Sequence, residues 1–189
     1  MQYGFKAKAE RISVEIREEL GLESIAAVCP WQLAQHLGII VFEPADLPLP
    51  ANDLHQLTVI DPGGWSGLTV KEAGITAVVL NPKHPKTRQR NSLMHEIAHV
   101  YLRHVGNRVD VSEHGLLLVS DFSTEQEDEA NWLAGALLVP REALLAARSS
   151  GKSPQQICRE YGVSEELCTW RLRMTGIEAQ IQHRRSKQA

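Results

Sequence analysis

The feature that most constrains this chain is a His-Glu-x-x-His motif, residues 95–99, inside a segment predicted to be helical. At about 3.6 residues per turn, His95 and His99 point within about 40° of each other, so both imidazoles can bind one metal ion. Glu96 is turned by about 100° from His95 and lies beside that ion. A base that acts on a metal-bound water belongs at that position, so the motif predicts a catalytic metal site.

The helix around the motif is predicted to span Arg88–Val105, which contains no glycine or proline. Its apolar side chains share one face, as in an amphipathic helix that packs on a core. The residues expected to face the core are Leu93, Met94, Ile97, Ala98, Tyr101 and Val105. The residues expected on the opposite face are Arg88, Ser92, His95, Glu96, His99 and Arg103.

A catalytic zinc ion needs a third protein ligand and one open position for water. His104 is expected to point about 180° away from His95 on the same helix, which excludes it as a ligand. The longer metalloprotease pattern, with Gly and then His after the second histidine, is absent because Leu102 and Val105 occupy those positions. A carboxylate from a later helix is the remaining common solution.

The later helix is predicted to begin at a capping box formed by Ser123 and Gln126 and to end before Pro140. Glu127 shares its stripe with residues expected to be buried, and a buried carboxylate is costly unless it is paired or binds a metal. Glu127 is therefore predicted to be the third ligand, with Asp128 as the alternative. The members of that stripe are Ala130, Asn131, Ala134 and Leu138. Asn131, one turn after Glu127, is predicted to hold a ligand in place.

These two segments resemble the ImmA/IrrE family of metallopeptidases. Residues 127–140 are similar to the family's Glu-x-x-Ala-Asn pattern that ends in Leu-Leu-x-Pro, and residues 88–99 are similar to its active helix. The resemblance covers roughly residues 24–175. Leu133, Val139 and Ala98 depart from the usual residues, but none of these changes removes a ligand. The resemblance assigns His95, His99 and Glu127 as ligands and Glu96 as the base, as the geometry does.

The resemblance also implies a small zinc-peptidase (zincin-like) fold, a cytoplasmic role and a partner protein. That partner is a helix-turn-helix transcriptional repressor, which some members of the family cleave. Two imidazoles and one carboxylate with an open position form a common catalytic zinc set, so Zn²⁺ is the expected cofactor. His114 is the first candidate for stabilising the oxyanion, followed by Tyr101 and Arg103.

The order of elements predicts an α+β fold with a short antiparallel or mixed sheet, followed by C-terminal helices. Helices are expected at 7–20 and 30–38, and strands at 39–42, 57–60, 66–70 and 76–80. If the strand at 76–80 is an exposed edge, a substrate can bind by adding a strand to it. We expect an N-terminal helix at 1–19, a zinc metallopeptidase domain at 20–148 and a C-terminal helical extension at 149–189.

Composition sets limits on location and partners. No apolar run approaches the ~18 residues of a membrane span, and no export signal is recognised at the start, so the expected location is the cytoplasm. Three cysteines without a Cys-x-x-Cys pair fit reduced thiols. Residues 151–189 carry 7 basic and 4 acidic side chains, whereas residues 1–150 carry 13 and 19.

Three functions therefore compete at this point. The first is a zinc endopeptidase that cleaves a cytoplasmic protein, most simply a helix-turn-helix repressor. The second is a metal-binding toxin or regulatory protein of a two-gene pair, which contacts its repressor or cognate antitoxin without proteolysis. The third is direct DNA contact by residues 153–175, which are predicted to form two helices and in which Arg171 and Arg173 could meet phosphates. The favoured interpretation is that these two helices simply cover the end of the peptidase core. Glu165 and Glu166 at the start of the second of these helices disfavour the third function, because they repel DNA.

Overall fold

A computed structural model describes residues 1–47, 51–60, 63–72, 74–106, 108–111, 117–120 and 122–187. Helices and strands follow the order expected of an α+β fold, which is confirmed. The elements of the first half are α1 (Phe5–Glu19), α2 (Pro30–His36), β1 (Ile39–Phe42), η1 (Pro44–Asp46), α3 (Ala51–His55), η2 (Gln56–Ile60), β2 (Gly67–Glu72) and β3 (Ile75–Leu80). Those of the second half are α4 (Lys86–Tyr101), β4 (Arg108–Val111), β5 (Leu117–Ser120), α5 (Thr124–Leu138), α6 (Arg141–Ser149), α7 (Pro154–Tyr161), α8 (Glu165–Thr175) and α9 (Ile177–Ser186).

The strands form one mixed sheet in the order β1-β3-β2-β5-β4. β1 pairs with β3 in parallel, with Ile39 opposite Thr76, and β2 pairs with β3 antiparallel, with Gly67 opposite Leu80. β5 pairs antiparallel with both β2 and β4. The expectation of a mixed sheet is confirmed.

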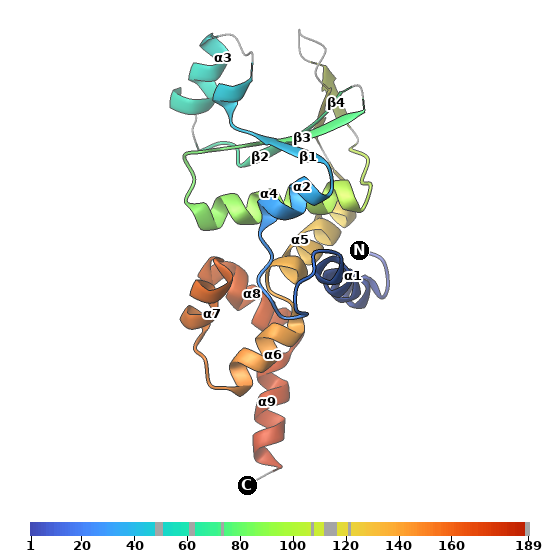
Figure 1. Ribbon diagram of the computed structural model, residues 1–189, viewed down its shortest axis with the longest axis vertical. Helices are drawn as coiled ribbons and strands as arrows, with labels where there is room; N and C mark the ends of the chain where they lie inside the picture. Colours follow the sequence, from blue (N-terminus) through green and yellow to red (C-terminus); the bar gives the residue numbers. More distant parts are fainter. Residues whose placement is uncertain are drawn as a thin grey trace.

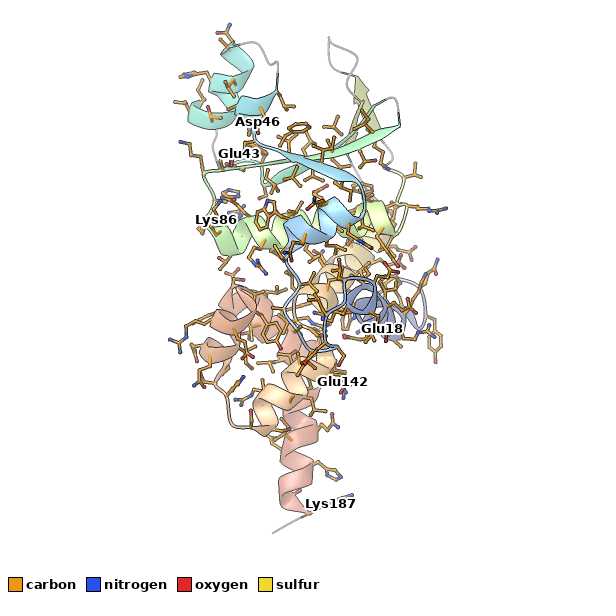
Figure 2. All side chains as sticks on the ribbon, viewed as in Figure 1. Glu18, Glu43, Asp46, Lys86, Glu142 and Lys187 are labelled. Carbon is orange, nitrogen blue, oxygen red and sulfur yellow. The ribbon has the colours of Figure 1, made fainter. Side chains whose placement is uncertain are left out.

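Helices α2 and α4 cover one face of this sheet, and α5 lies on the far side of α4 (Figure 1). Side chains from the sheet and from the two helices fill the space between them (Figure 2). Val78 and Leu80 of β3 and Ile97 of α4 are buried there. Helix α4 therefore lies between the sheet and α5: its Glu96 contacts Thr69 of β2, and its His95 and His99 face Glu127 of α5.

One expectation about the sheet is wrong, and the condition attached to another is not met. Residues 57–60 do not form a strand, because η2 is a π-helical turn that continues α3 directly, and Val59 and Ile60 are 58% and 62% exposed. An apolar run of four residues cannot by itself distinguish a strand from a short helical segment. The strand at 76–80 exists as β3, but it lies between β1 and β2 and is not an edge available to a substrate.

Helix α5 is the central helix of the molecule. Nearly every residue after its second turn is buried, from Ala130 through Leu138 with the exception of Asn131. It packs along both α4 and α1, and its Gly135 allows α8 to approach closely. A Cβ atom at Gly135 would lie 2.8 Å from Cζ3 of Trp170 and 2.9 Å from Cδ of Arg171. One cluster of buried apolar side chains therefore includes residues from all three of the segments expected from the sequence.

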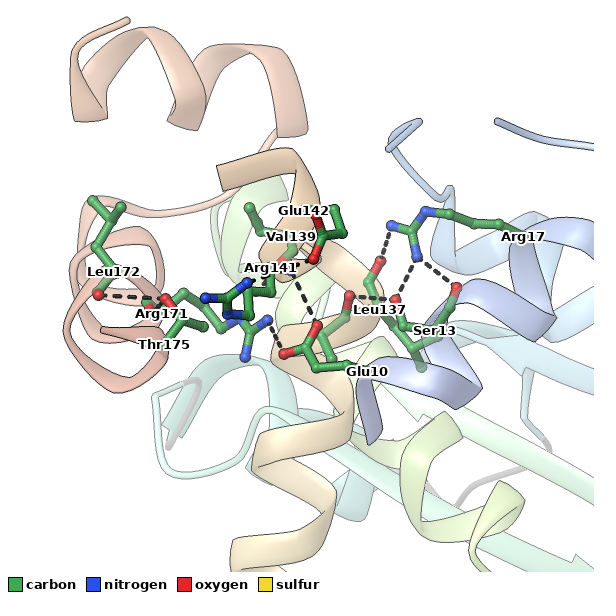
Figure 3. A network of polar contacts seen from close by, with 11 residues as sticks. Glu10, Ser13, Arg17, Leu137, Val139, Arg141, Glu142, Arg171, Leu172 and Thr175 are labelled. Atoms are coloured by element: carbon green, nitrogen blue, oxygen red, sulfur yellow. Dashed lines mark hydrogen bonds and ion pairs between the residues drawn. The ribbon is translucent and has the colours of Figure 1, made fainter. Parts of the chain in front are cut away.

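The C-terminal end of α5 is held by polar side chains from both ends of the chain (Figure 3). The Ser13 hydroxyl donates to the Ala136 carbonyl at 2.7 Å, and Nη2 of Arg17 donates to the Leu137 carbonyl at 2.7 Å. Nε of Arg171 donates to the Val139 carbonyl at 3.0 Å. The last carbonyls of a helix have no partner inside it, so these side chains supply bonds that would otherwise be missing.

The two helices expected at 153–175 are present as α7 and α8, and Gly162 lies between them. The disfavoured alternative, in which Arg171 meets DNA phosphates, does not hold. Its side chain is fully buried and its Nη2 lies 2.6 Å from Oε1 of Glu10. Arg171 therefore forms hydrogen bonds within the protein and is not available to a partner. Of the two arginines, only Arg173 is exposed.

None of the helices in the described ranges has the length and apolar character that crossing a bilayer requires.

The hydrogen bonds that Arg17 makes at the C-terminal end of α5, here called the clamp, lead to a prediction about stability. Replacing Arg17 by Ala removes the partner of the Leu137 carbonyl and of the Ala26 carbonyl, which Nε of Arg17 contacts at 2.8 Å. Unpaired buried polar groups are costly, so the free energy of unfolding should fall by about 3 kcal/mol in urea denaturation. Arg11→Ala is the matched control because Arg11 is exposed on the same helix, and it should change stability by less than ~0.5 kcal/mol. Equal effects of the two substitutions would contradict the clamp.

Candidate metal centre

The packing of α4 against α5 brings His95, His99 and Glu127 together. His95 and His99 lie one turn apart on α4, and Glu127 lies in the first turn of α5. The capping box predicted at Ser123 is present, with the Ser123 hydroxyl accepting from the Gln126 amide at 3.3 Å. This cap fixes where α5 begins and therefore which residue of its first turn faces α4.

The donor atoms of these three residues are spaced as one metal ion requires. The Nε2 atoms of His95 and His99 lie 3.0 Å apart. The Glu127 carboxylate lies 3.3 Å from Nε2 of His95 and 3.5 Å from Nε2 of His99. Atoms bound at about 2.0–2.2 Å to a tetrahedral zinc ion lie roughly 3.3–3.6 Å apart. The two distances to Glu127 fall in this range, and the distance between the imidazole nitrogens is slightly shorter. The three residues therefore fit the metal that the motif predicts.

The three ligand candidates differ in exposure. The His99 side chain is 2% exposed, whereas those of His95 and Glu127 are 22% and 41% exposed. The group thus has a buried side at His99 and a side that solvent can reach. An arrangement of this kind leaves room for the open position that distinguishes a catalytic site from a structural one.

His99 is suited to bind a metal because its ring is neutral. Burial is the main cause that lowers the pKa of His99 to about 3, and the neighbouring imidazoles of His95 and His104 lower it further. A neutral imidazole offers a lone pair on one nitrogen, which is the form that binds metal. The stacked ring of Phe122, with centroids 3.8 Å apart, covers one face of the His99 imidazole.

Glu96 lies beside the ligands and contacts the sheet instead of joining them. The Thr69 hydroxyl on β2 donates to Oε2 of Glu96 at 2.5 Å. Burial raises the pKa of the Glu96 carboxyl, and the hydrogen bond from Thr69 acts in the opposite direction. A carboxyl with a raised pKa exchanges protons nearer to neutral pH, which suits a general base that must later return its proton.

His104 lies outside the ligand group, as expected. The reason given for this, that His104 points to the opposite side of the same helix, was wrong. Helix α4 ends at Tyr101, and Arg103 has a left-handed φ of 55°. The amide of His104 donates to the His99 carbonyl and that of Arg103 to the Val100 carbonyl, which is a Schellman motif. The turn brings Nδ1 of His104 to 3.0 Å from Nδ1 of His99.

The same turn corrects the expected core face. Val105 is 75% exposed, because the chain has left the helix before reaching it. Arg103 occupies a backbone conformation that glycine or asparagine usually adopts, so the sequence carried no ordinary signal of a helix end here.

The residues that sequence reasoning missed are Thr69, His104, Phe122 and Glu129. Glu129, two residues after Glu127, faces His104. Oε2 of Glu129 lies 3.5 Å from Nε2 of His104, and its side chain is 12% exposed. These residues could be identified only from the fold. They come from β2, from the turn after α4 and from the region around the start of α5, which are far from the motif in the sequence or outside its helix.

The remaining predicted site residues lie elsewhere. Asn131 is exposed and lines a cavity of about 450 Å³ together with Asp128, and no hydrogen bond in the described contacts joins it to the three ligand candidates. Asp128 is likewise exposed, which disfavours it as the alternative ligand. The prediction that His114 stabilises the oxyanion concerns a residue outside the described ranges.

Comparison with known proteins gives one family match. The family model described as IrrE N-terminal-like domain (Peptidase M78) matches residues 34–173. This range includes both the motif helix and α5. A comparison with curated proteins gave no match.

Solved structures match the fold at low sequence identity. One of them is described as "Mycobacterium tuberculosis transcriptional regulator", with 18% identity and a TM-score of 0.51. The match covers 90% of this chain and 47% of the other, so this chain spans about half the length of that protein. At this identity the similarity supports the fold alone.

The ligand geometry predicts which carboxylate of α5 binds metal. In Glu127→Ala the group loses one of its three donors, so the dissociation constant for zinc should rise at least about 100-fold, since even the outer partners of metal ligands are worth roughly 10–100-fold. Asp128→Ala is the matched control and should bind zinc as the wild type does. Metal content after dialysis and competition with a chelator measure the difference. Stronger loss in Asp128→Ala than in Glu127→Ala would reverse the assignment.

Proposed function

Because the chain belongs to the IrrE N-terminal-like (Peptidase M78) family of metallopeptidases, as its motifs predicted, we propose that it is a zinc-dependent endopeptidase acting on a protein. The observation that carries this proposal is the meeting of His95, His99 and Glu127 next to Glu96. A purely structural metal site would have no need of the partly buried carboxylate of Glu96. Hydrolysis does need one, because water must lose a proton as it attacks the peptide carbonyl.

His95, His99 and Glu127 would hold the zinc ion. When bound, zinc lowers the pKa of a water to about 7 and polarises a carbonyl oxygen. Two imidazoles and a carboxylate also resemble the set that binds iron in oxygenases. The placement of Glu96 within the His-Glu-x-x-His helix favours hydrolysis over oxygen chemistry.

Glu96 is proposed to act as the base and then as the acid. The hydrogen bond from Thr69 is made to Oε2, which leaves Oε1 to accept the proton of the attacking water. The same carboxyl then donates that proton to the amine that leaves. Thr69 is proposed to fix the rotamer of Glu96, so that one oxygen keeps its direction during both transfers.

The substrate is proposed to bind as an extended segment beside β2. Residues 67–72 of β2 all pair with β3, whereas on the other side only Val70 and Lys71 pair with β5 among the described residues. Gly67–Thr69 lies next to Glu96 and can accept a further strand, which places a peptide bond near the metal ligands. A substrate must therefore present a flexible or locally unfolded stretch.

We propose a helix-turn-helix transcriptional repressor as that substrate and the cytoplasm as the place of reaction, as the family resemblance implies. The acidic character of residues 1–150 is compatible with a basic, DNA-binding partner. The alternative is a partner or toxin role in a two-gene pair, in which contact with a repressor or antitoxin suffices. The two differ in whether the bound partner is cut.

The proposal predicts that Glu96→Gln abolishes cleavage without releasing metal. The amide keeps the shape of the side chain but cannot accept a proton, so kcat should fall roughly 10²–10⁴-fold. The candidate repressor is incubated with wild type and variant in the presence of zinc, and products are followed on gels and by mass spectrometry. Metal content measured on both proteins is the control.

Cleavage at equal rates by both proteins would exclude Glu96 as the base. Absence of cleavage by the zinc-loaded wild type, together with stable binding of the repressor, would favour the role without proteolysis. Glu125 is an exposed residue in the first turn of α5, so the control variant Glu125→Gln should cleave the repressor at the wild-type rate.

A further inference from the structure

We infer that His104 and Glu129 are positioning residues that hold His99 in the one ring orientation and tautomer that can bind the metal. This inference rests on the proposed metal site. It concerns the side of the His99 ring that faces away from the metal. Neither residue belongs to the His-Glu-x-x-His motif, and each reaches His99 only through the fold.

The contacts form a single chain of ring nitrogens and a carboxylate. Nε2 of His99 faces His95 at 3.0 Å, and Nδ1 of the same ring faces Nδ1 of His104 at 3.0 Å. The other nitrogen of His104, Nε2, lies 3.5 Å from Oε2 of Glu129. In each of the two rings, one nitrogen therefore faces the proposed metal position and the other faces in the direction of Glu129.

These distances allow one arrangement of protons when Nε2 of His99 binds metal. The lone pair on Nε2 is then committed, so the His99 proton is on Nδ1 and is donated to Nδ1 of His104. His104 must accept there, which places its own proton on Nε2, facing the Glu129 carboxylate. A carboxylate can only accept when ionised, so it fixes the direction of both hydrogen bonds.

The surrounding structure holds this chain in place. The side chains of His104 and Glu129 are 7% and 12% exposed, and both residues line a cavity of about 470 Å³ beside Gln2. The amide of Gln2 donates to the second oxygen of Glu129, Oε1, at 2.9 Å. The ring of Phe122 stacks on His99 and lies 6.2 Å from that of His104.

The turn after α4 is the element that makes the contact possible. A continuous helix would carry His104 to the opposite side from His95, as the periodicity of the sequence indicates. The left-handed Arg103 turns the chain back over the last turn of α4 instead. His104 is thereby placed behind His99, where it can orient the ring but cannot reach the metal.

Four variants test the inference. His104→Phe keeps a buried ring but removes the acceptor for Nδ1 of His99, and His104→Asn restores an acceptor near the position of Nδ1 but not the donor that faces Glu129. Glu129→Gln keeps the shape but can present an amide donor to His104. Glu125→Gln is the matched control on the same helix, because its side chain is 79% exposed. Urea denaturation shows which variants are folded.

The first measurement is zinc affinity by competition with a chromophoric chelator. His104→Phe and Glu129→Gln should weaken zinc binding about 10–100-fold, as is typical for the hydrogen-bond partners of metal ligands. His104→Asn should recover part of the loss, because it restores the acceptor for His99 but not the contact with Glu129, and Glu125→Gln should match the wild type. Zinc affinity of His104→Phe within threefold of the wild type, in a folded protein, would overturn the inference.

The second measurement needs neither metal nor activity. Long-range ¹H–¹⁵N correlations of the imidazole rings in the metal-free protein should show His99 protonated on Nδ1 and His104 on Nε2. A His99 ring protonated on Nε2 would overturn the inference even if the protein proved to be a peptidase. Failure of the wild type to bind zinc would instead refute the proposed function, while the tautomers would still decide the role of His104.

Discussion

The packing of α4 against α5 is the interaction on which the rest of the structure depends. Helix α4 is packed between the sheet and α5, with Leu93 and Ile97 fully buried, and its two motif histidines face the start of α5. The capped start of α5 then presents Glu127 at hydrogen-bonding distances from both. A slide of one helix along the other by a single turn, about 5.4 Å, would separate the three donor atoms.

Helix α5 is electrostatically matched to its surroundings at both ends. Its first turn, where the helix dipole is positive, contains Glu125 and Glu127, and an ionised carboxylate is favoured there. Its last carbonyls, at the negative end of the dipole, accept hydrogen bonds from the guanidinium groups of Arg17 and, one residue beyond, Arg171. The contacts that stabilise the C-terminal end therefore also fix the position of the metal ligand at the other end.

Local signals allowed much of this site to be predicted from the sequence. The i, i+4 spacing of His95 and His99 and the capping box at Ser123 depend only on neighbouring residues, and both occur as expected. The apolar run at 57–60 was misread as a strand, since a short run has the same pattern in a helical turn. The strand at 76–80 lies inside the sheet and is not an edge. Its place could not be predicted because strand order is decided by pairing between distant segments.

The fates of the polar side chains on α5 show why the remaining residues could not be predicted. A helix that is covered on nearly all sides cannot be divided into a buried face and a solvated face by angle alone. Glu127 meets the histidines of α4, Glu129 meets His104, and Asp128 with Asn131 faces an open cavity. The contact of Glu129 with His104 depends on the turn at Arg103, which the sequence did not signal. The contacts of each side chain are set by the element that packs beside it. Glu129, two residues from the ligand Glu127, can therefore act on the same site through His104.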